Sequence, residues 1–393
     1  MTEITYTLPA TSRIELNPAA LENNLAFLRK YIGPQTKISS VVKANAYGHG
    51  FNQFIPLAEG MGIDHFSVFS SHEAFQVNSI KSTATRLMIM GWLSDDEIEW
   101  AIQNNIEFYV FDLSRLESAI SLSRKLGKPA KIHFEVETGM NRTGLNRKEL
   151  RQAVEMIKHH PDNVHVTGVC THFAGAESIA NYYRVQAQIR KYKKIVAWME
   201  TQGIRPEFRH TASSAAALSY PATRMDLVRI GIAQYGFWPS AEIYMDYVHS
   251  LKEKIDPLQR MLSWKSEIMS IKDVREGEFV SYGTTYLAQS DKRIAVIPVG
   301  YASGFSRSLS NQGRVLIDGQ RVAVIGLVNM NMLIADITHI PNAQPGDEVV
   351  LIGRQGDLEI SVASFSEISN QLNYELLTRL PQDINRVVKP LTQ

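Results

Sequence analysis

The chain has 393 residues, of which 44% are hydrophobic and 21% are charged, and its formal net charge is +1. This length exceeds one ordinary hydrophobic core, so we expect two domains. The near-neutral charge gives no reason to expect nucleic acid or an anionic membrane as a partner. No apolar run reaches about 18 residues, no secretory signal opens the chain, and Cys170 is the single cysteine, which together indicate a reducing cytoplasm.

The first part of the chain alternates between strand-like and helical patterns. Residues Ile4–Leu8 alternate like a strand, Asn17-Pro18 predicts the start of a helix, and Gly33-Pro34 predicts its end. The following buried strand-like runs are Ile38–Val42, Phe66–Phe69, Arg86–Met90, Phe108–Phe111, Ile132–Val136, Val164–Cys170, Phe208–Thr211 and Leu227–Ile232. Eight strands with helices between them predict a (β/α)8 barrel of the TIM type over residues 1–245, with residues 1–11 as a strand of the second domain. An open doubly wound sheet is the alternative that the pattern leaves.

The pattern changes after Pro239, where strand-like runs follow one another with few helices. These runs are Leu262–Ile271, Phe279–Tyr286, Ile294–Pro298, Val315–Ile317, Val322–Val328 and Val349–Ile352. Asp318-Gly319 between two of them predicts a hairpin turn. Ser361–Leu372 is the one clear helical pattern. We therefore expect a β-rich domain over residues 246–393.

Chemistry-bearing side chains stand where predicted barrel strands end. Lys43 follows the first strand, Arg142 the fifth, His172 the sixth and Ser214 the seventh, while Arg229 belongs to the eighth. The carboxyl ends of barrel strands share one face, so these side chains converge on one mouth. A lysine there is either ion-paired or snorkelling, or it has a pKa lowered by burial and serves as an imine-forming amine or a base.

Each of the other side chains also fits an ordinary structural role. Arg142 could be a solvated loop charge, His172 a satisfied interior histidine and Ser214 a helix cap. Arg229 is harder to explain in that way, because a buried guanidinium needs acceptors.

Several segments together resemble the alanine racemase family, in the same order through nearly the whole chain. The segments that carry the resemblance are Val41–Gly50 (VVKANAYGHG), Glu135–Arg142 (EVETGMNR), Cys170–Ala174, His210–Ala216, Val228–Ile232, Ser281–Tyr286, Gly300–Ala302 and Asn373–Glu375.

This resemblance implies a cofactor, pyridoxal 5'-phosphate, bound to Lys43 as a Schiff base, and it implies no metal. Arg229 would face the pyridine nitrogen, and Arg142 the phenolic oxygen. The other residues expected to bind the cofactor are Tyr47, His172, Ser214, Gly231, Ile232 and Tyr374. Because an arginine keeps its proton, the ring nitrogen would stay unprotonated, which disfavours transamination.

The resemblance also implies a reaction in which two bases work on opposite faces of a small amino-acid substrate. Lys43 would serve one face and Tyr282 of the partner subunit the other, with His172 and Arg229 placing positive charge near that tyrosine. Arg142, Met330 and Tyr301 would contact the substrate. The expected protein is a cytoplasmic homodimer with shared active sites that supplies D-alanine for peptidoglycan.

The sequence departs from the family at Glu135, where a lysine, carbamylated in some members, usually orients the arginine that matches Arg142. Glu135 would supply a permanent carboxylate instead. Charge is also lost at the expected substrate entrance, at Leu327 and Asn331. This loss leaves open a racemase of broader or different specificity, for example for serine or lysine.

Two further alternatives come from other classes of protein. A decarboxylase of the same architecture, fold type III, would be expected to place a carboxylate at the pyridine nitrogen and to use a cysteine, so Arg229 and Tyr282 argue against it. A non-enzymatic cofactor carrier would need only the barrel, so the complete second domain with its tyrosines argues against that.

Overall fold

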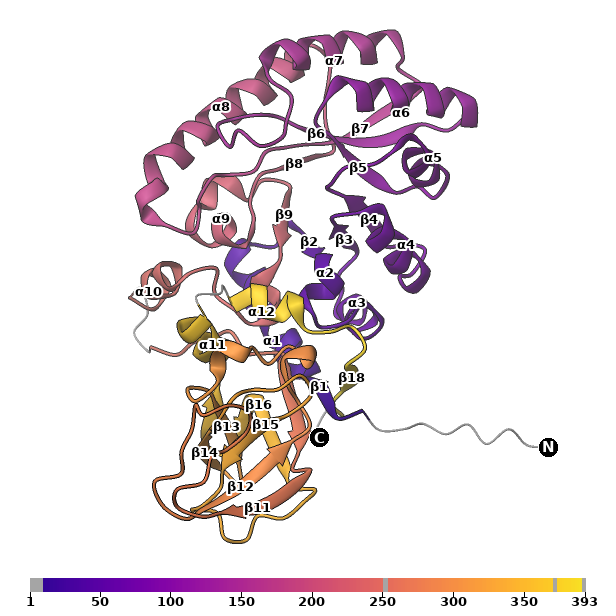
Figure 1. Cartoon of the computed structure of the whole chain (residues 1–393). Helices are drawn as coiled ribbons and strands as arrows, with labels where there is room; N and C mark the ends of the chain where they lie inside the picture. Colours follow the sequence, from indigo (N-terminus) through magenta and orange to yellow (C-terminus); the bar gives the residue numbers. More distant parts are fainter. Residues whose placement is uncertain (1–9, 250–253, 370–372, 391–393) are drawn as a thin grey trace, which may run out of the picture. The chain divides into compact units, whose positions relative to one another are not determined.

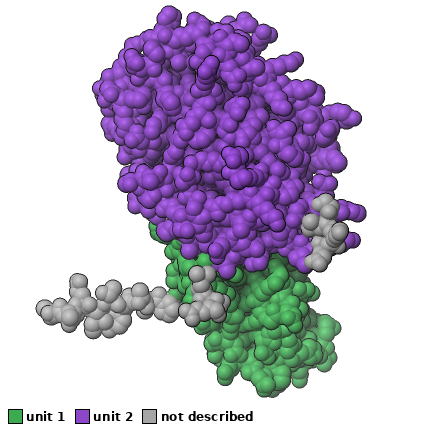
Figure 2. Space-filling view, turned by 180° about the vertical axis from the view of Figure 1, so that it is seen from behind, with its two compact units in different colours: residues 1–18, 47–53, 260–393 green, residues 19–46, 54–259 purple. Residues whose placement is uncertain are grey.

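The computed structural model describes residues 10–249, 254–369 and 373–390, so the strand predicted at Ile4–Leu8 lies outside the described residues. The chain divides into two compact units, which Figure 2 shows in different colours. We call residues 19–46 and 54–259 the barrel unit, and residues 1–18, 47–53 and 260–393 the β-rich unit. The stretch that carries Lys43 and Tyr47 crosses from the first unit into the second.

The barrel unit contains eight parallel strands in the order β8-β7-β6-β5-β4-β3-β2-β9. Their bounds are β2 (Lys37–Val41), β3 (His65–Val68), β4 (Arg86–Ile89), β5 (Glu107–Val110), β6 (Ala130–Glu135), β7 (Val164–Cys170), β8 (Phe208–His210) and β9 (Leu227–Ile230). Strands β8 and β9 stand at the two ends of this order. An isolated parallel bridge between Ser213 and Arg229 joins these two ends, and there the Arg229 N–H donates to the Ala212 carbonyl at 2.9 Å. The predicted barrel is therefore confirmed, and the open sheet is excluded.

Helices follow most strands and lie around the sheet (Figure 1). They are α1 (Pro18–Ile32), α2 (Lys43–Tyr47), α3 (Phe51–Gly60), α4 (Ser71–Ile80), α5 (Asp95–Gln103), α6 (Leu113–Leu126), α7 (Arg147–His159), α8 (Tyr182–Thr201), α9 (Ser214–Ser219) and α10 (Ala241–His249). Local sequence explains their ends. Helix α1 begins at Pro18, whose fixed φ suits a first helical position, and ends before Gly33, which has φ +107°. A capping box of Asn146 and Glu149 starts α7.

The β-rich unit contains two sheets. The larger has the order β14-β13-β16-β10-β1-β18 with β17 on β16, and the smaller is β11-β12-β15. Their bounds are β1 (Ser12–Leu16), β10 (Leu262–Glu267), β11 (Ser270–Val274), β12 (Lys292–Ile297), β13 (Arg314–Ile317), β14 (Gln320–Ala323), β15 (Leu333–Asp336), β16 (Glu348–Gln355), β17 (Leu358–Ile360) and β18 (Asn385–Val388). The hairpin predicted at Asp318-Gly319 joins β13 to β14, and both turn residues have positive φ, as a type I′ turn requires.

Several expectations for this unit were wrong. The run Leu262–Ile271 is two strands, β10 and β11, which belong to different sheets, and the run Val322–Val328 is a strand only as far as Ala323. Phe279–Tyr286 is not a strand, because Ser281 and Gly283 adopt φ of +70° and +68° and only a bridge between Phe279 and Leu287 remains. Helix α11 (Val362–Ser369) is also followed by a second helix, α12 (Asn373–Arg379), which carries Tyr374. In the described parts of both units, no helix is long and apolar enough to cross a membrane.

Candidate active site

Lys43 lies two residues after the end of strand β2 and opens an unusual turn. Ala44, Asn45, Ala46 and Tyr47 all have φ between 50° and 54°, so α2 continues as a left-handed turn. Each such residue other than glycine costs about 1–2 kcal/mol. Hydrogen bonds hold the turn in place, and one of them runs from the Ala44 N–H to Glu73 Oε1 at 2.6 Å. Backbone strain of this kind collects at functional sites.

The surroundings of Lys43 favour its neutral amine. Its side chain reaches solvent, yet desolvation by the surrounding protein lowers its pKa. The cations Arg142 and Arg229 lower this pKa further, and Glu73 opposes them. The lowered pKa expected from the sequence is therefore present, and it makes Lys43 a better nucleophile and base.

Arg229 lies buried inside the barrel, with 6% of its surface exposed, and is bonded to the last residue of β8 and to the residues that follow β7 and β8. Nη1 donates to Nδ1 of His210 at 2.7 Å and to the His210 carbonyl at 3.0 Å. Nη2 donates to the carbonyls of Thr171 at 3.0 Å and Thr211 at 3.2 Å. Among the described residues, none accepts a bond from the Arg229 Nε–H. That group is the one N–H of this guanidinium left for a ligand.

His172 lies beside Arg229, with Nδ1 at 3.5 Å from Nη2. Burial lowers the pKa of His172 to about 3, and the cations Arg229, Arg142 and Lys43 contribute. The imidazole is therefore neutral near pH 7. Because Nδ1 faces a guanidinium, which can only donate, we assign the proton to Nε2.

Ser214 and Gly231 connect the ends of strands β8 and β9. Ser214 is the first residue of α9, and its Oγ accepts the Gly231 N–H at 3.0 Å. Ser213 occupies the cap position, so Ser214 is not the helix cap. The 3₁₀ turn η3 (Ile232–Tyr235) begins beside it. First-turn N–H groups lack partners within their helix, so Ser214 and Ile232 offer donors suited to a phosphate, while the Gly231 N–H is taken by Ser214.

Arg142 stands on a tight loop after strand β6 and is exposed. Glu137 holds this loop by accepting the N–H groups of Gly139 and Asn141. Glu135 is buried, which raises its pKa, and a hydrogen bond from Thr143 and the charges of Arg229 and Arg142 act against that rise. Among the described residues no ion pair joins Glu135 to Arg142, and Arg142 acts on Glu135 through its charge alone.

The β-rich unit brings together in space the two segments that carry the expected cofactor tyrosines Tyr47 and Tyr374, which are far apart along the chain. Tyr47 is followed by Gly48, which has φ +82° and packs so closely that a Cβ there would lie 2.1 Å from the Leu377 carbonyl oxygen. Leu377 belongs to α12, the helix that carries Tyr374. The side chain of Arg386 fixes the Gly48 carbonyl through Nε and Nη2 at 3.2 and 3.1 Å.

The same unit gathers Tyr282, Tyr301 and Met330 on adjoining loops. The Tyr301 N–H donates to the Asn329 carbonyl, and Ser281 Oγ donates to the Leu327 carbonyl at 2.9 Å. All three side chains are exposed, to 73%, 40% and 55% respectively. Aromatic and apolar side chains with this much exposed surface can contact another molecule.

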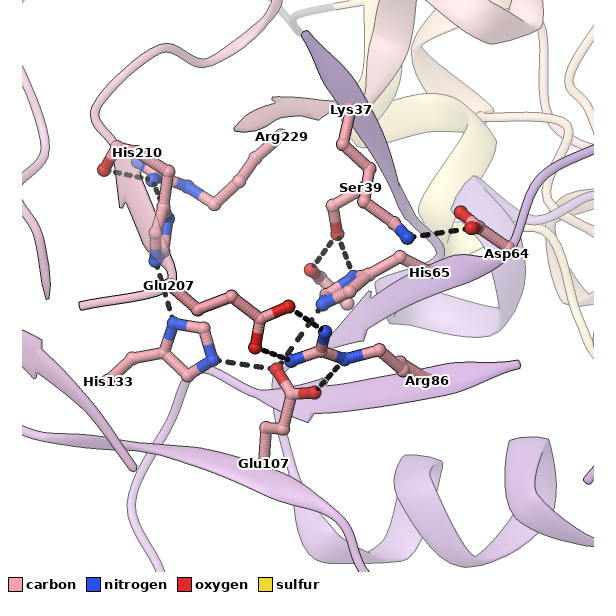
Figure 3. A network of polar contacts seen from close by, with 11 residues as sticks. Lys37, Ser39, Asp64, His65, Arg86, Glu107, His133, Glu207, His210 and Arg229 are labelled. Atoms are coloured by element: carbon pink, nitrogen blue, oxygen red, sulfur yellow. Dashed lines mark hydrogen bonds and ion pairs between the residues drawn. The ribbon is translucent and has the colours of Figure 1, made fainter. Parts of the chain in front are cut away.

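Sequence reasoning missed the polar interior of the barrel. His65, Glu107 and His133 come from three strands and join His210 and Arg229 in one hydrogen-bonded chain (Figure 3). It also missed Glu73, which accepts the Ala44 and Phe69 N–H groups. A signal for the first set was present, because charged or imidazole side chains interrupt otherwise apolar strands.

Comparisons with known proteins agree with this arrangement. The family model described as alanine racemase, N-terminal domain, matches residues 16–239, and the model for the C-terminal domain matches residues 261–388. The chain belongs to the alanine racemase family. The resemblance stated from the sequence motifs is thereby confirmed.

Individual members of the alanine racemase family cover nearly the whole chain. An alanine racemase of Methanococcus maripaludis is 35% identical over 95% of this chain and 97% of its own, and one of Leptospira interrogans is 33% identical over 96% of both. Among solved structures, alanine racemase from Bacillus anthracis with bound L-Ala-P has a TM-score of 0.88 at 31% identity, covering 98% of this chain and 96% of its own. The alanine racemase of Bartonella henselae, with covalently bound pyridoxal phosphate, has a TM-score of 0.82 at 26% identity, covering 97% of this chain and 100% of its own.

Proposed function

We propose that this chain is a pyridoxal-phosphate-dependent alanine racemase, an isomerase that interconverts L- and D-alanine with Lys43 and Tyr282 as its two bases. The observation that carries the proposal is the convergence of Lys43, Arg142, His172 and Arg229 on one barrel mouth, where their charges act on one another. Full-length similarity to alanine racemases supports alanine as the substrate.

The residues at the barrel mouth fit pyridoxal phosphate. Lys43 offers an amine with a lowered pKa, the Nε–H of Arg229 offers a donor to a ring nitrogen, and the Ser214 hydroxyl with the Ile232 N–H suits a phosphate. Tyr47, Tyr374 and His172 complete the set that would hold the cofactor, while Gly231 holds the Ser214 hydroxyl in place through its N–H. When bound, the cofactor stabilises negative charge at the substrate Cα. Because Arg229 cannot give up its proton, it leaves the ring nitrogen unprotonated.

The chain's own groups would move the proton. Lys43 Nζ takes or returns it on one face of Cα, and Tyr282 Oη of the partner subunit does so on the other. Arg229 lies beside His172, with Nη2 at 3.5 Å from Nδ1. We expect its positive charge to favour the phenolate form of Tyr282 of the partner subunit. Arg142, the Met330 N–H and Tyr301 would hold the substrate. This division of labour requires a homodimer, and it fits a cytoplasmic role in supplying D-alanine to peptidoglycan.

We expect Glu135 to orient the Arg142 loop through Thr143. The change Glu135→Gln removes the carboxylate without changing its size, and it should raise KM or lower kcat by about 10–100-fold, the scale for losing an orienting group next to a site. Steady-state kinetics measure this change. Wild-type activity should not respond to bicarbonate, whereas Glu135→Lys should be impaired and recover in part when bicarbonate is added. Native kinetics for Glu135→Gln would reject this role.

A chiral product assay tests the proposed function. The purified protein with added pyridoxal phosphate is given L-alanine, and separately L-serine and L-lysine, while D-amino acid and CO2 are followed. We expect D-alanine to accumulate to a 1:1 mixture, faster than the other D-amino acids. Preferential turnover of serine or lysine would favour the broader racemase, and release of CO2 without D-alanine would favour a decarboxylase.

A further inference from the structure

A string of ionisable side chains runs through the interior of the barrel, where apolar layers are usual. Glu107 and His65 are the first residues of β5 and β3, at the amino end of the barrel. His133 lies within β6, and His210 and Arg229 lie at the carboxyl ends of β8 and β9. All five are buried, with at most 6% of the residue surface exposed. The string therefore spans the barrel from one end to the other.

The hydrogen bonds of this string have one consistent direction. The guanidinium of Arg229 can only donate, so Nδ1 of His210, at 2.7 Å, must be its acceptor and carry no proton. His210 then holds its proton on Nε2 and donates it to Nδ1 of His133 at 2.8 Å. His133 in turn donates from Nε2 to Oε2 of Glu107 at 2.7 Å. Each imidazole is thus a neutral ring with one defined tautomer.

The charges around the string support this assignment. Burial lowers the pKa of His133 and of His210, and Arg229 also lowers that of His210, so both rings stay neutral. Burial opposes ionisation of Glu107, but hydrogen bonds from His133 and His65 outweigh it and hold the pKa of Glu107 well below its usual range. Arg86 Nε donates to the other oxygen of Glu107. Glu107 is therefore a carboxylate, and a carboxylate can only accept.

The tautomer of His210 decides how Arg229 is held. With the proton on Nε2, Nδ1 accepts from Nη1 and helps to keep the guanidinium in one orientation, with Nε–H free among the described residues. With the proton on Nδ1, two donors would face each other at 2.7 Å. Without Glu107 as a fixed acceptor, the Nδ1–H tautomers of His133 and His210 become accessible. In that tautomer His210 no longer accepts from Nη1, and only the bonds to backbone carbonyls would hold the guanidinium.

We propose that Glu107, acting through His133 and His210, is a positioning residue that locks Arg229 with its Nε–H directed at the ring nitrogen of the cofactor. This inference rests on the proposed function, and it extends the site from the barrel mouth to the opposite end of the barrel (Figure 3). The partner of an imidazole sets its tautomer in the same way beside metal sites, where losing that partner costs about 10–100-fold in activity.

We call the hydrogen-bonded series Glu107, His133, His210 and Arg229 the relay, and the chain offers a matched control for it. Glu207 accepts from Nη1 and Nη2 of the same Arg86 that binds Glu107, but it lies at the surface and contacts no histidine of the relay. Glu107→Gln removes the buried carboxylate at constant size, and Glu207→Gln removes the exposed one. A general loss of the Arg86 ion pairs affects both variants, whereas the relay is affected by Glu107→Gln alone.

Nitrogen-15 NMR of the protein labelled at its 11 histidines, without cofactor, reads the tautomers directly. We expect His210 and His133 to show a single Nε2–H tautomer in the wild type and in Glu207→Gln, and a mixture for His210 in Glu107→Gln. With cofactor, Glu107→Gln should lower kcat for alanine by about 10–100-fold, with KM within about 2-fold and a shifted absorption maximum of the bound cofactor. Glu207→Gln should match the wild type.

The result that would overturn the relay is an Nδ1–H tautomer of His210 in the wild type, or a Glu107→Gln variant with wild-type tautomers and kcat. The wild-type spectrum decides this even if Glu107→Gln fails to fold, and Glu107→Asp, which keeps the charge but shortens the side chain, should give an intermediate kcat. A wild-type protein with the expected tautomers but no racemase activity would instead contradict the proposed function, so the two failures are distinguishable.

Discussion

Lys43→Ala should abolish racemisation, with kcat lowered by at least about 10³-fold, within the range for loss of a general base. The physical reason is that, among the described residues, Lys43 is the lysine that combines a lowered pKa with a place just after the carboxyl end of β2. Rate measurements with L- and D-alanine test this. Treatment of the wild type with borohydride should also fix the cofactor's mass on the peptide that contains Lys43.

Lys37→Ala is the matched control for this change. Lys37 begins the same strand and pairs with Asp64 at 2.6 Å at the opposite end of the barrel, so its removal should leave kcat unchanged. A wild type that stays colourless with added pyridoxal phosphate, or a Lys43→Ala variant with substantial activity, would contradict the assigned role of Lys43.

Tyr282→Phe should be nearly inactive, because it removes only the phenolic oxygen that we assign to the second face of the substrate. The side chain is 73% exposed within its own chain, so its removal should leave the thermal midpoint of unfolding unchanged. Tyr301→Phe, on an adjoining exposed loop, should lower activity less. Loss of activity at unchanged stability separates a chemical role from a structural one.

Mixing inactive Lys43→Ala and Tyr282→Phe proteins should restore activity. If protomers reassort at random, half of the dimers are mixed, and each mixed dimer has one complete site of two, which gives about a quarter of native activity. Analytical mass spectrometry of differently labelled protomers verifies the exchange. Verified exchange without recovery would mean that both bases act within one chain.

Much of the fold could be predicted because its signals are local. The run Val164–Cys170 coincides with strand β7, and Pro18 and Gly33 mark the ends of α1. Phe279–Tyr286 misled the prediction, since its aromatic residues favour a strand while Ser281 and Gly283 take positive φ. Loop hydrogen bonds such as that from Ser281 to the Leu327 carbonyl decide that geometry, and they come from distant sequence.

The candidate site was predictable only at its rim. Side chains that follow strands, such as His172, meet at one face because the carboxyl ends of all barrel strands lie there. Their convergence therefore follows from the order of strands in the sequence. The relay inside the barrel does not follow from the order of strands. The alternation along a strand tells which face of the sheet a side chain lies on, but it does not tell which side chain of another strand it contacts. Glu107 and His133 form a pair because β5 and β6 are neighbours in the barrel, and the sequence alone does not give their register. The left-handed turn after Lys43 likewise has no local signal, since Ala44 and Ala46 do not favour it.

Two bases on opposite faces of Cα carry out the proposed reaction, and the incorporation of deuterium from heavy water tests this most directly. L-alanine with protium at Cα is converted in D2O, and the first few per cent of D-alanine are analysed by mass spectrometry. Because the base that removes the proton is not the base that supplies the new one, we predict deuterium at Cα in nearly all of this early product. Early D-alanine that retains the substrate's protium would contradict two bases and indicate one group that serves both faces.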